Sequence, residues 1–139
     1  ASLAAGDVHA AKHILEESLR KEPGSWEARQ SLAQVMKLQK DVPRARALLE
    51  EAVGLVPLEE GPVNDLAVLL LEQKDPAAAE RPLEALVKAK PEALGARLNL
   101  ALVLVQLGIK ADAKPHAQAA AKSADAAVAE QAVRLLGQL

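Results

Sequence analysis

The sequence predicts an all-α solenoid of antiparallel helix pairs, because three series of residues recur with a period of 34 residues. The series are alanine at Ala11, Ala45, Ala79 and Ala113, proline at Pro23, Pro57 and Pro91, and leucine at Leu32, Leu66 and Leu100. A fixed period of this length indicates one supersecondary unit that is repeated, each copy burying its apolar face against the next. We expect one solenoid domain over residues 1–139, with a half repeat at 1–25 and complete repeats at 26–59, 60–93 and 94–127.

The half repeat is expected to contain one helix and the end of another. Residues 2–5 match the last turn of a first helix, Gly6 and Asp7 match a break, and residues 8–21 match a second, amphipathic helix. This pattern predicts a chain that continues an array begun upstream, with an open edge at its front.

The first complete repeat shows both helices clearly. Apolar residues recur at helical spacing over residues 26–39, and residues 40–43 supply a break. Asp41 is a suitable N-cap for the second helix, and Pro43 is tolerated in its first turn. That helix is expected to stop before Pro57, because the residue preceding a proline is disfavoured in the helical region.

The later repeats follow the same order of helix, break and helix, and the last repeat differs at its break and at its end. In repeat 60–93, Asp75 as cap and Pro76 as first helical residue form a strong start signal. In repeat 94–127, Gly108 marks the break between the helices. Asp125 stands where earlier repeats have proline, and it predicts the start of a C-terminal capping helix at 126–136.

Two prolines interrupt the pattern of the second helices. Pro82 and Pro115 each fall inside a predicted helix, where proline removes a backbone donor and clashes with the preceding turn. We therefore expect a kink or a late helix start at both, with Asp112 as the cap if the helix of Pro115 starts late.

Composition excludes several classes of function. The 17 basic and 19 acidic residues give a formal net charge of -2, and Trp26 is the only aromatic residue, so neither charge nor base stacking favours a nucleic-acid partner. The longest apolar run, 98–107, is too short to span a bilayer, so we expect a soluble protein without direct membrane insertion. The absence of cysteine removes disulfides and thiolate chemistry and leaves cytoplasmic and periplasmic locations open.

No pattern points to catalysis, a metal or a cofactor. His9 and His13 are four residues apart on a predicted helix and could share one face, but two ligands do not make a metal site. Their offset from the apolar stripe predicts solvated surface histidines. The sequence has no paired nucleophile and base and no glycine-rich phosphate loop, so we expect a protein that is not an enzyme.

The repeat resembles the tetratricopeptide repeat family. The family's small residue at the helix crossing matches Ala33, Ala67 and Ala101, and its turn matches Gly6 with Asp7, Lys40 with Asp41, Lys74 with Asp75, and Gly108. Its second small residue and terminal proline match the alanine and proline series above. The family's aromatic positions hold Met36, Leu70, Leu104, Leu15, Leu49 and Leu83 here, so the packing is expected to be aliphatic.

The resemblance implies a right-handed superhelix whose first helices line a concave groove that binds a peptide or an amphipathic helix of another protein. The candidate partner-binding residues at groove positions are Gln30, Gln34, Asn64, Val68, Leu71, Leu98, Asn99, Leu102 and Val105. Asn64 and Asn99 are expected to be free to bond the backbone of the partner. The basic residues of the family's carboxylate clamp are absent, and only Asn99 occupies a clamp position, so we expect no such clamp.

Two alternatives stay open at this point. Leu98, Leu102 and Val105 could be core residues that the final helix or a partner repeat covers, rather than a binding surface. The chain could also be a structural or self-associating module whose open front edge docks on a second copy or on the rest of a longer parent protein. Family members are frequent in bacterial pilus, secretion and polysaccharide-export machinery, which implies a scaffold or adaptor within a larger assembly.

Overall fold

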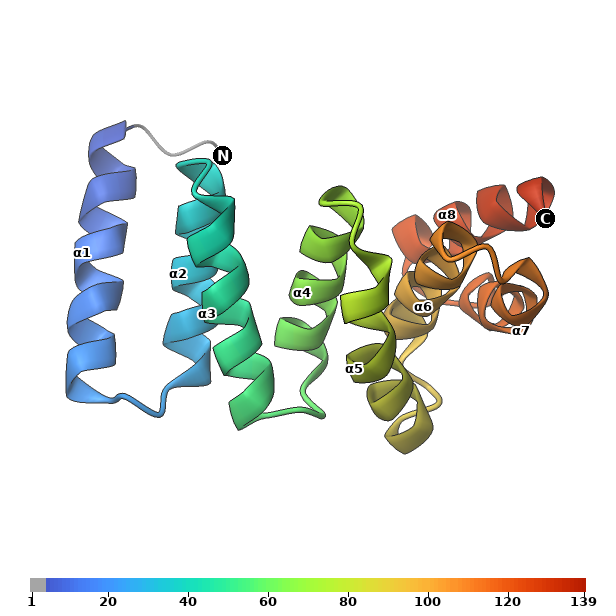
Figure 1. The fold of residues 1–139 in the computed structure, drawn as a ribbon, viewed down its shortest axis with the longest axis horizontal. Coiled ribbons are helices and arrows are strands. Elements are labelled where there is room, and N and C mark those ends of the chain that lie inside the picture. The colour runs from blue at the N-terminus through green and yellow to red at the C-terminus, as the bar shows by residue number, and fades with distance from the viewer. Residues whose placement is uncertain (1–4) are drawn as a thin grey trace. The chain divides into compact units, whose positions relative to one another are not determined.

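The chain, seen in a computed structural model that describes residues 5–139, contains eight α-helices and no strand in that range (Figure 1). Two compact units divide it, unit 1 ending at Pro57 and unit 2 spanning Leu58–Leu139. Unit 1 holds α1 (Ala5–Lys21), α2 (Trp26–Leu38) and α3 (Val42–Leu55). Unit 2 holds α4 (Glu60–Glu72), α5 (Pro76–Ala89), α6 (Leu94–Gln106), α7 (Lys110–Ala120) and α8 (Ala126–Gln138). The predicted all-α fold of paired helices is confirmed.

In unit 1, α2 packs against both α1 and α3. Ala33 of α2 and Ala45 of α3, both fully buried, belong to the small-residue positions of the repeat. Leu32, Met36 and Leu49 fill the space around them and are also buried. Small side chains where helices meet let the backbones approach closely, and the larger aliphatic residues then fill the core at high density. This is why the alanine series keeps its spacing.

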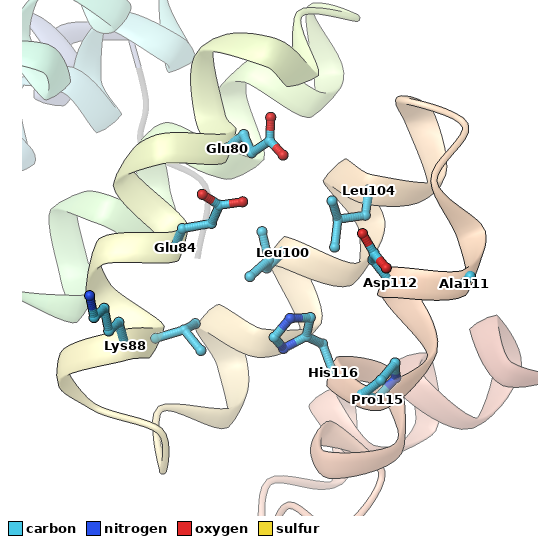
Figure 2. Close-up of a pocket in the computed structure, with 10 residues that line it drawn as sticks. Glu80, Glu84, Lys88, Leu100, Leu104, Ala111, Asp112, Pro115 and His116 are labelled. Carbon is cyan, nitrogen blue, oxygen red and sulfur yellow. The ribbon is translucent and has the colours of Figure 1, made fainter.

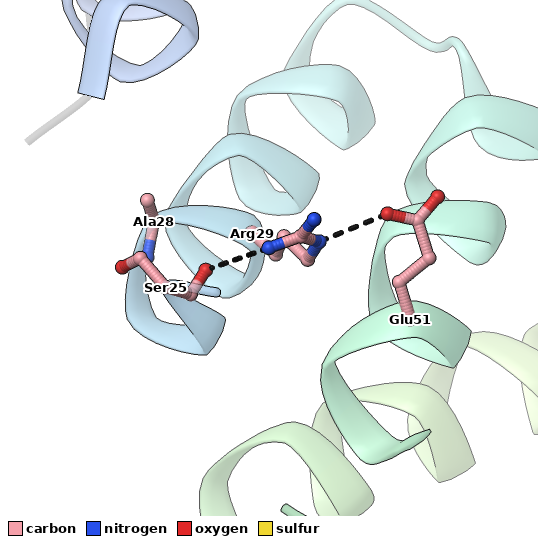
Figure 3. Close-up of polar contacts among 4 residues, drawn as sticks. All are labelled: Ser25, Ala28, Arg29 and Glu51. Carbon is pink, nitrogen blue, oxygen red and sulfur yellow. Dashed lines mark hydrogen bonds and ion pairs between the residues drawn. The ribbon is translucent and has the colours of Figure 1, made fainter. Parts of the chain in front are cut away.

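Polar groups fix the ends of the helices in unit 1. The Ser25 hydroxyl accepts a hydrogen bond from the Ala28 N–H at 3.2 Å, and the Asp41 carboxylate accepts one from the Arg44 N–H at 3.3 Å, so both cap helices as expected of these residue types. Arg29 joins α2 to α3, because its Nε donates to Glu51 Oε2 at 2.9 Å while its Nη1 donates to the Ser25 carbonyl at 3.2 Å (Figure 3).

In unit 2, the pairs α4 with α5 and α6 with α7 repeat this packing, and α6 also lies against α4 and α8. The core again combines small and aliphatic residues at the repeat positions, and each of the following is buried: Ala67, Leu70, Ala79, Leu83, Ala101, Leu104 and Ala113. Stacked first helices therefore form one side of the unit, and second helices form the other.

The turn between the two helices has the same backbone geometry in every complete repeat. Lys40, Lys74 and Gly108 have φ angles of 61°, 59° and 83°, which place all three in the left-handed region. The following N–H then bonds back to a carbonyl five residues earlier, Asp41 to Met36, Asp75 to Leu70, and Ile109 to Leu104. This is the helix end in which one left-handed residue lets the last carbonyls of the helix be satisfied.

The capping helix α8 repeats the register of a first helix with a changed composition. Arg134 and Gln138 occupy the positions that are buried leucine or methionine in α2, α4 and α6. The Asp125 carboxylate accepts hydrogen bonds from the N–H groups of Ala127 at 3.0 Å and Val128 at 3.5 Å, as expected for an N-cap. Polar residues at the positions that elsewhere pack on a second helix suit a helix that ends a stack.

One local expectation is wrong, and one alternative of a second is excluded. Gly6 and Asp7 do not break the chain, because both lie in the first turn of α1; glycine permits a turn but also adopts helical angles. Helices α5 and α7 do not start late, since they begin at Pro76 and Lys110 and continue through Pro82 and Pro115. A kink at Pro82 or Pro115 stays a prediction. Most of the helical turn expected at residues 2–5 lies outside the described residues.

None of the helices within residues 5–139 has the length and apolar character needed to cross a membrane.

Candidate binding surface

Four apolar residues of the candidate set lie at two equivalent positions of neighbouring first helices in unit 2. Val68 on α4 corresponds to Leu102 on α6, and Leu71 corresponds to Val105. The Gln106 amide donates to the Leu71 carbonyl at 3.5 Å, which ties the ends of these two helices together. Val68 is 39% exposed, and the other three are half-buried. We call Val68, Leu71, Leu102 and Val105 the first-helix face.

Leu98, another candidate residue, lies in the core. Its side chain is 4% exposed and packs in a cluster with Ala120 and Ala132, against which Leu102 and Val128 also pack. The final helix therefore covers Leu98, as one of the two sequence interpretations proposed. Leu102 lies at the margin of this cluster and remains partly accessible.

The two candidate asparagines bond to each other. The Asn99 Nδ2 donates to Asn64 Oδ1 at 3.1 Å, and Asn99 is 9% exposed while Asn64 is half-buried. The expectation that both side chains are free is therefore wrong. The physical reason is that the two asparagines, 35 residues apart, lie on adjacent first helices, where a buried amide needs a partner.

Helix α8 adds polar residues to the first-helix face. A cavity of about 340 Å³ is lined by Leu102 together with Gln131, Arg134, Leu135 and Gln138. The Arg134 guanidinium makes no ion pair with any residue that the structure describes. Sequence reasoning missed these four residues because it treated α8 only as a cap. Their register gave no signal either, since Arg134 and Gln138 stand at positions that are buried in the other first helices.

The remaining candidates, Gln30 and Gln34, lie on α2 in unit 1. Gln30 is half-buried, Gln34 is exposed, and both take part in polar interactions. They belong to a different compact unit from the first-helix face, so the structure groups the candidate set into two parts.

The first-helix face offers recognition rather than chemistry. Apolar side chains next to a guanidinium and two amides can bury an apolar anchor and bond a carbonyl or carboxylate beside it. No group of three or more His, Cys, Asp or Glu side chains that could hold a metal occurs within residues 5–139, and His9 and His13 are both exposed on α1.

Comparisons with known proteins agree with this architecture. Profiles of the tetratricopeptide repeat (TPR) family match residues 2–60 and 64–132. No curated protein matches the chain by sequence.

Three solved structures illustrate the similarity in fold. YrrB, described as a TPR protein with an unusual peptide-binding site, is 17% identical with a TM-score of 0.74, covering 96% of this chain and 68% of that one. Yeast Tom70 is 21% identical with a TM-score of 0.76, covering 91% of this chain and 28% of Tom70. PilF of Pseudomonas aeruginosa is 24% identical with a TM-score of 0.69, covering 96% of this chain and 69% of PilF. At these identities the likeness concerns the fold.

Proposed function

Because the chain belongs to the tetratricopeptide repeat family, whose repeats form protein–protein interaction modules, we propose that its first-helix face binds an amphipathic helix or extended peptide of another protein. The observation that carries the proposal is the register of Val68 with Leu102 and of Leu71 with Val105, which leaves paired apolar side chains accessible on stacked helices. Paired apolar anchors are what an amphipathic helix or a peptide with two or three apolar side chains recognises.

The cavity that α8 forms with Leu102 indicates that the partner also carries a polar group. An apolar side chain of the partner would rest on Leu102 and Leu135, and the Arg134 guanidinium beside them would bond a carbonyl or carboxylate oxygen. We therefore favour a partner segment with an acidic or carbonyl group next to its apolar anchor. YrrB, with its described peptide-binding site, supports the peptide class of ligand by analogy of fold.

The TPR fold is a non-catalytic scaffold type, and we infer that this chain is likewise a scaffold or adaptor rather than an enzyme. Within the proposal it works as part of a larger multi-protein assembly. We further propose that all repeats act as one solenoid domain, and that Gln30 and Gln34 of α2 contact the partner from within unit 1.

The direct test is partner capture followed by titration. The wild-type chain and a Leu102→Glu variant are used to capture partners from native lysate, and a synthetic peptide from the captured protein is then titrated. Leu102→Glu places a charge among the apolar anchors, so we expect binding at least about ten-fold weaker than wild type.

The matched control is Ala85→Glu, which adds the same charge on the exposed side of α5. Equal affinity of wild type and Ala85→Glu, with loss in Leu102→Glu, supports the proposal. If Leu102→Glu and Leu71→Glu both bind the peptide as tightly as wild type, the first-helix face is not the binding surface.

Self-association is a second candidate, favoured by one observation on α1. Ile14 is 63% exposed there, more than any other large aliphatic side chain that the structure describes. Sedimentation over a range of concentrations distinguishes the two functions. A dimer that dissociates in Ile14→Asp supports self-association, and a strict monomer excludes it.

A further inference from the structure

We propose that unit 2 carries a second binding site, on the opposite side of α6 from the first-helix face, and that this site takes an arginine side chain of a partner protein. The site is a cavity of about 550 Å³ lined by residues of α5, α6 and α7 (Figure 2). It goes beyond the proposed function, because its residues are distinct from those of the first-helix face. We call it the second-helix pocket.

The pocket combines an apolar floor with acidic walls. Leu100 and Leu104 are one helical turn apart on α6 and form the floor, whereas Leu102 points to the other side of the same helix. Glu80 and Glu84 of α5 stand on one wall, and Asp112 of α7 stands on the other. In Figure 2 the three carboxylates project toward the same space.

Unit 1 contains the equivalent pocket, and there an arginine of the chain itself stands in the lining beside the glutamate. That cavity, of about 430 Å³, is lined by His13, Glu16, Leu19, Arg20, Leu32, Arg44 and Leu48. Glu16 stands two periods before Glu84, and Arg44 stands two periods before Asp112. The Arg44 Nη2 donates to Glu16 Oε2 at 3.0 Å, so a guanidinium from the chain itself binds the equivalent glutamate.

Unit 2 keeps the glutamate but replaces the arginine with Asp112. None of Glu80, Glu84 and Asp112 forms an ion pair among the described residues, and Lys88 is the one lysine or arginine in the pocket lining. Desolvation, then the negative charge of Glu80 and a hydrogen bond with the Glu80 side chain, raise the pKa of the Glu84 carboxyl, whereas the positive charge of Arg81 opposes this shift. The pocket therefore holds repelling negative charges that a cation from outside would neutralise.

A guanidinium suits this pocket better than an ammonium group. Its planar fork of donors can bond carboxylates on both walls at once, and its aliphatic stem can pack on Leu100 and Leu104. His116, at the edge of the pocket, accepts a hydrogen bond at Nδ1 from Arg97 Nε at 3.4 Å, so this imidazole is neutral in the bonded state and adds no competing charge.

The test uses N-acetyl-arginine amide as the probe, titrated into the full chain and followed by amide chemical shifts in NMR. We expect saturable shifts in residues 80–88 and 111–116, which weaken as salt concentration rises. N-acetyl-citrulline amide, a neutral molecule of similar shape, should produce none of these shifts, and the lysine analogue should bind more weakly than arginine. Equal binding of citrulline or lysine would overturn the assignment.

Variants of exposed residues locate the site without disturbing the core. Glu84→Gln and Asp112→Asn should each weaken arginine binding about ten-fold, through loss of a charge-assisted hydrogen bond. Asp112→Arg recreates the Glu16 with Arg44 pair of unit 1 and should abolish probe binding. The control Glu60→Gln removes the same charge from the first turn of α4 and should leave binding unchanged.

Leu102→Glu distinguishes this inference from the proposed function, because the variant should bind arginine as the wild type does and should bind the peptide at least about ten-fold more weakly. Absence of saturable shifts, or full binding in Asp112→Arg, would overturn the second-helix pocket and leave the first-helix face untouched.

Discussion

Asn99 shows how one residue constrains its neighbours. It is buried, and its amide has Asn64 as its hydrogen-bonding partner at 3.1 Å. Asn64→Ala would leave the buried amide without that bond, so we expect a loss of about 1–3 kcal/mol in the free energy of unfolding. Urea denaturation followed by circular dichroism measures this change.

The double variant Asn64→Ala, Asn99→Leu is the control for this prediction. Replacing both partners by apolar groups removes the unsatisfied amide, so the double variant should recover most of the stability that the single variant loses. A double variant as unstable as Asn64→Ala would show that the bond is not the cause.

His116 makes stability depend on pH. Burial, and then the positive charge of Arg97, lowers the pKa of His116 below its ordinary value of 6.5, while Asp112 opposes this shift. Glu80, Glu84 and Lys88 of α5 line the same pocket. The unfolded state therefore binds a proton more readily than the folded state, so the contribution of neutral His116 is complete above about pH 6.5 and is lost as pH falls through the folded pKa.

Melting temperatures of wild type and His116→Gln, measured from about pH 7 to about pH 5, check the sign. Glutamine does not titrate, so the wild type should lose more stability on acidification than the variant does. Parallel curves for the two proteins would contradict the expected linkage.

At the scale of elements, the turns between paired helices carry conformational strain. Lys40 and Lys74 adopt the left-handed conformation that Gly108 adopts in the last complete repeat. A side chain in this region costs about 1–2 kcal/mol, and glycine costs some chain entropy in return. Lysine adopts this conformation at positions 40 and 74 because the hydrogen bonds at the helix end require a left-handed residue.

Lys74→Gly should therefore raise the free energy of unfolding by about 0.5–1 kcal/mol. The reciprocal change, Gly108→Ala, should lower it by about 1 kcal/mol or more. A β-carbon at Gly108 would meet no atom within 4 Å, so strain rather than steric contact is tested. Chemical denaturation of both variants gives the signs, and a stabilised Gly108→Ala would refute the argument.

At the scale of the whole molecule, the two compact units each have a core of their own. Leu49 is fully buried in unit 1, and Leu49→Ala should cost about 2–5 kcal/mol. In a solenoid, stability is close to a sum over repeats and their nearest neighbours, so we expect faster hydrogen exchange chiefly in α1, α2 and α3.

Hydrogen exchange measured by mass spectrometry distinguishes the regions, with Leu83→Ala of α5 as the matched variant in unit 2. Leu49→Ala should lose protection chiefly in the helices of unit 1, and Leu83→Ala chiefly in those of unit 2. The same loss of protection over α6 and α7 in both would mean that the chain unfolds as a single cooperative body.

Much of the fold is predictable from the sequence because it rests on local chemistry that repeats. The 34-residue period marks the small residues at helix contacts, and Asp41, Asp75 and Asp125 mark helix starts that the structure confirms. Gly6 is the exception, since a glycine by itself is compatible with both a turn and a helix.

The candidate surfaces depend on contacts between helices that are one or more repeats apart. Register alone placed Val68 with Leu102, but only packing decided that α8 covers Leu98, that Asn64 and Asn99 bond to each other, and that Arg134 joins the first-helix face. The difference between Arg44 and Asp112 at equivalent positions is visible in the sequence. Only the packing of three helices shows that each of these residues lines a pocket. The sequence by itself therefore determined the repeat, because local spacing specifies helices and turns. The tertiary structure decided which side chains remain accessible, because burial depends on the neighbours that packing brings together.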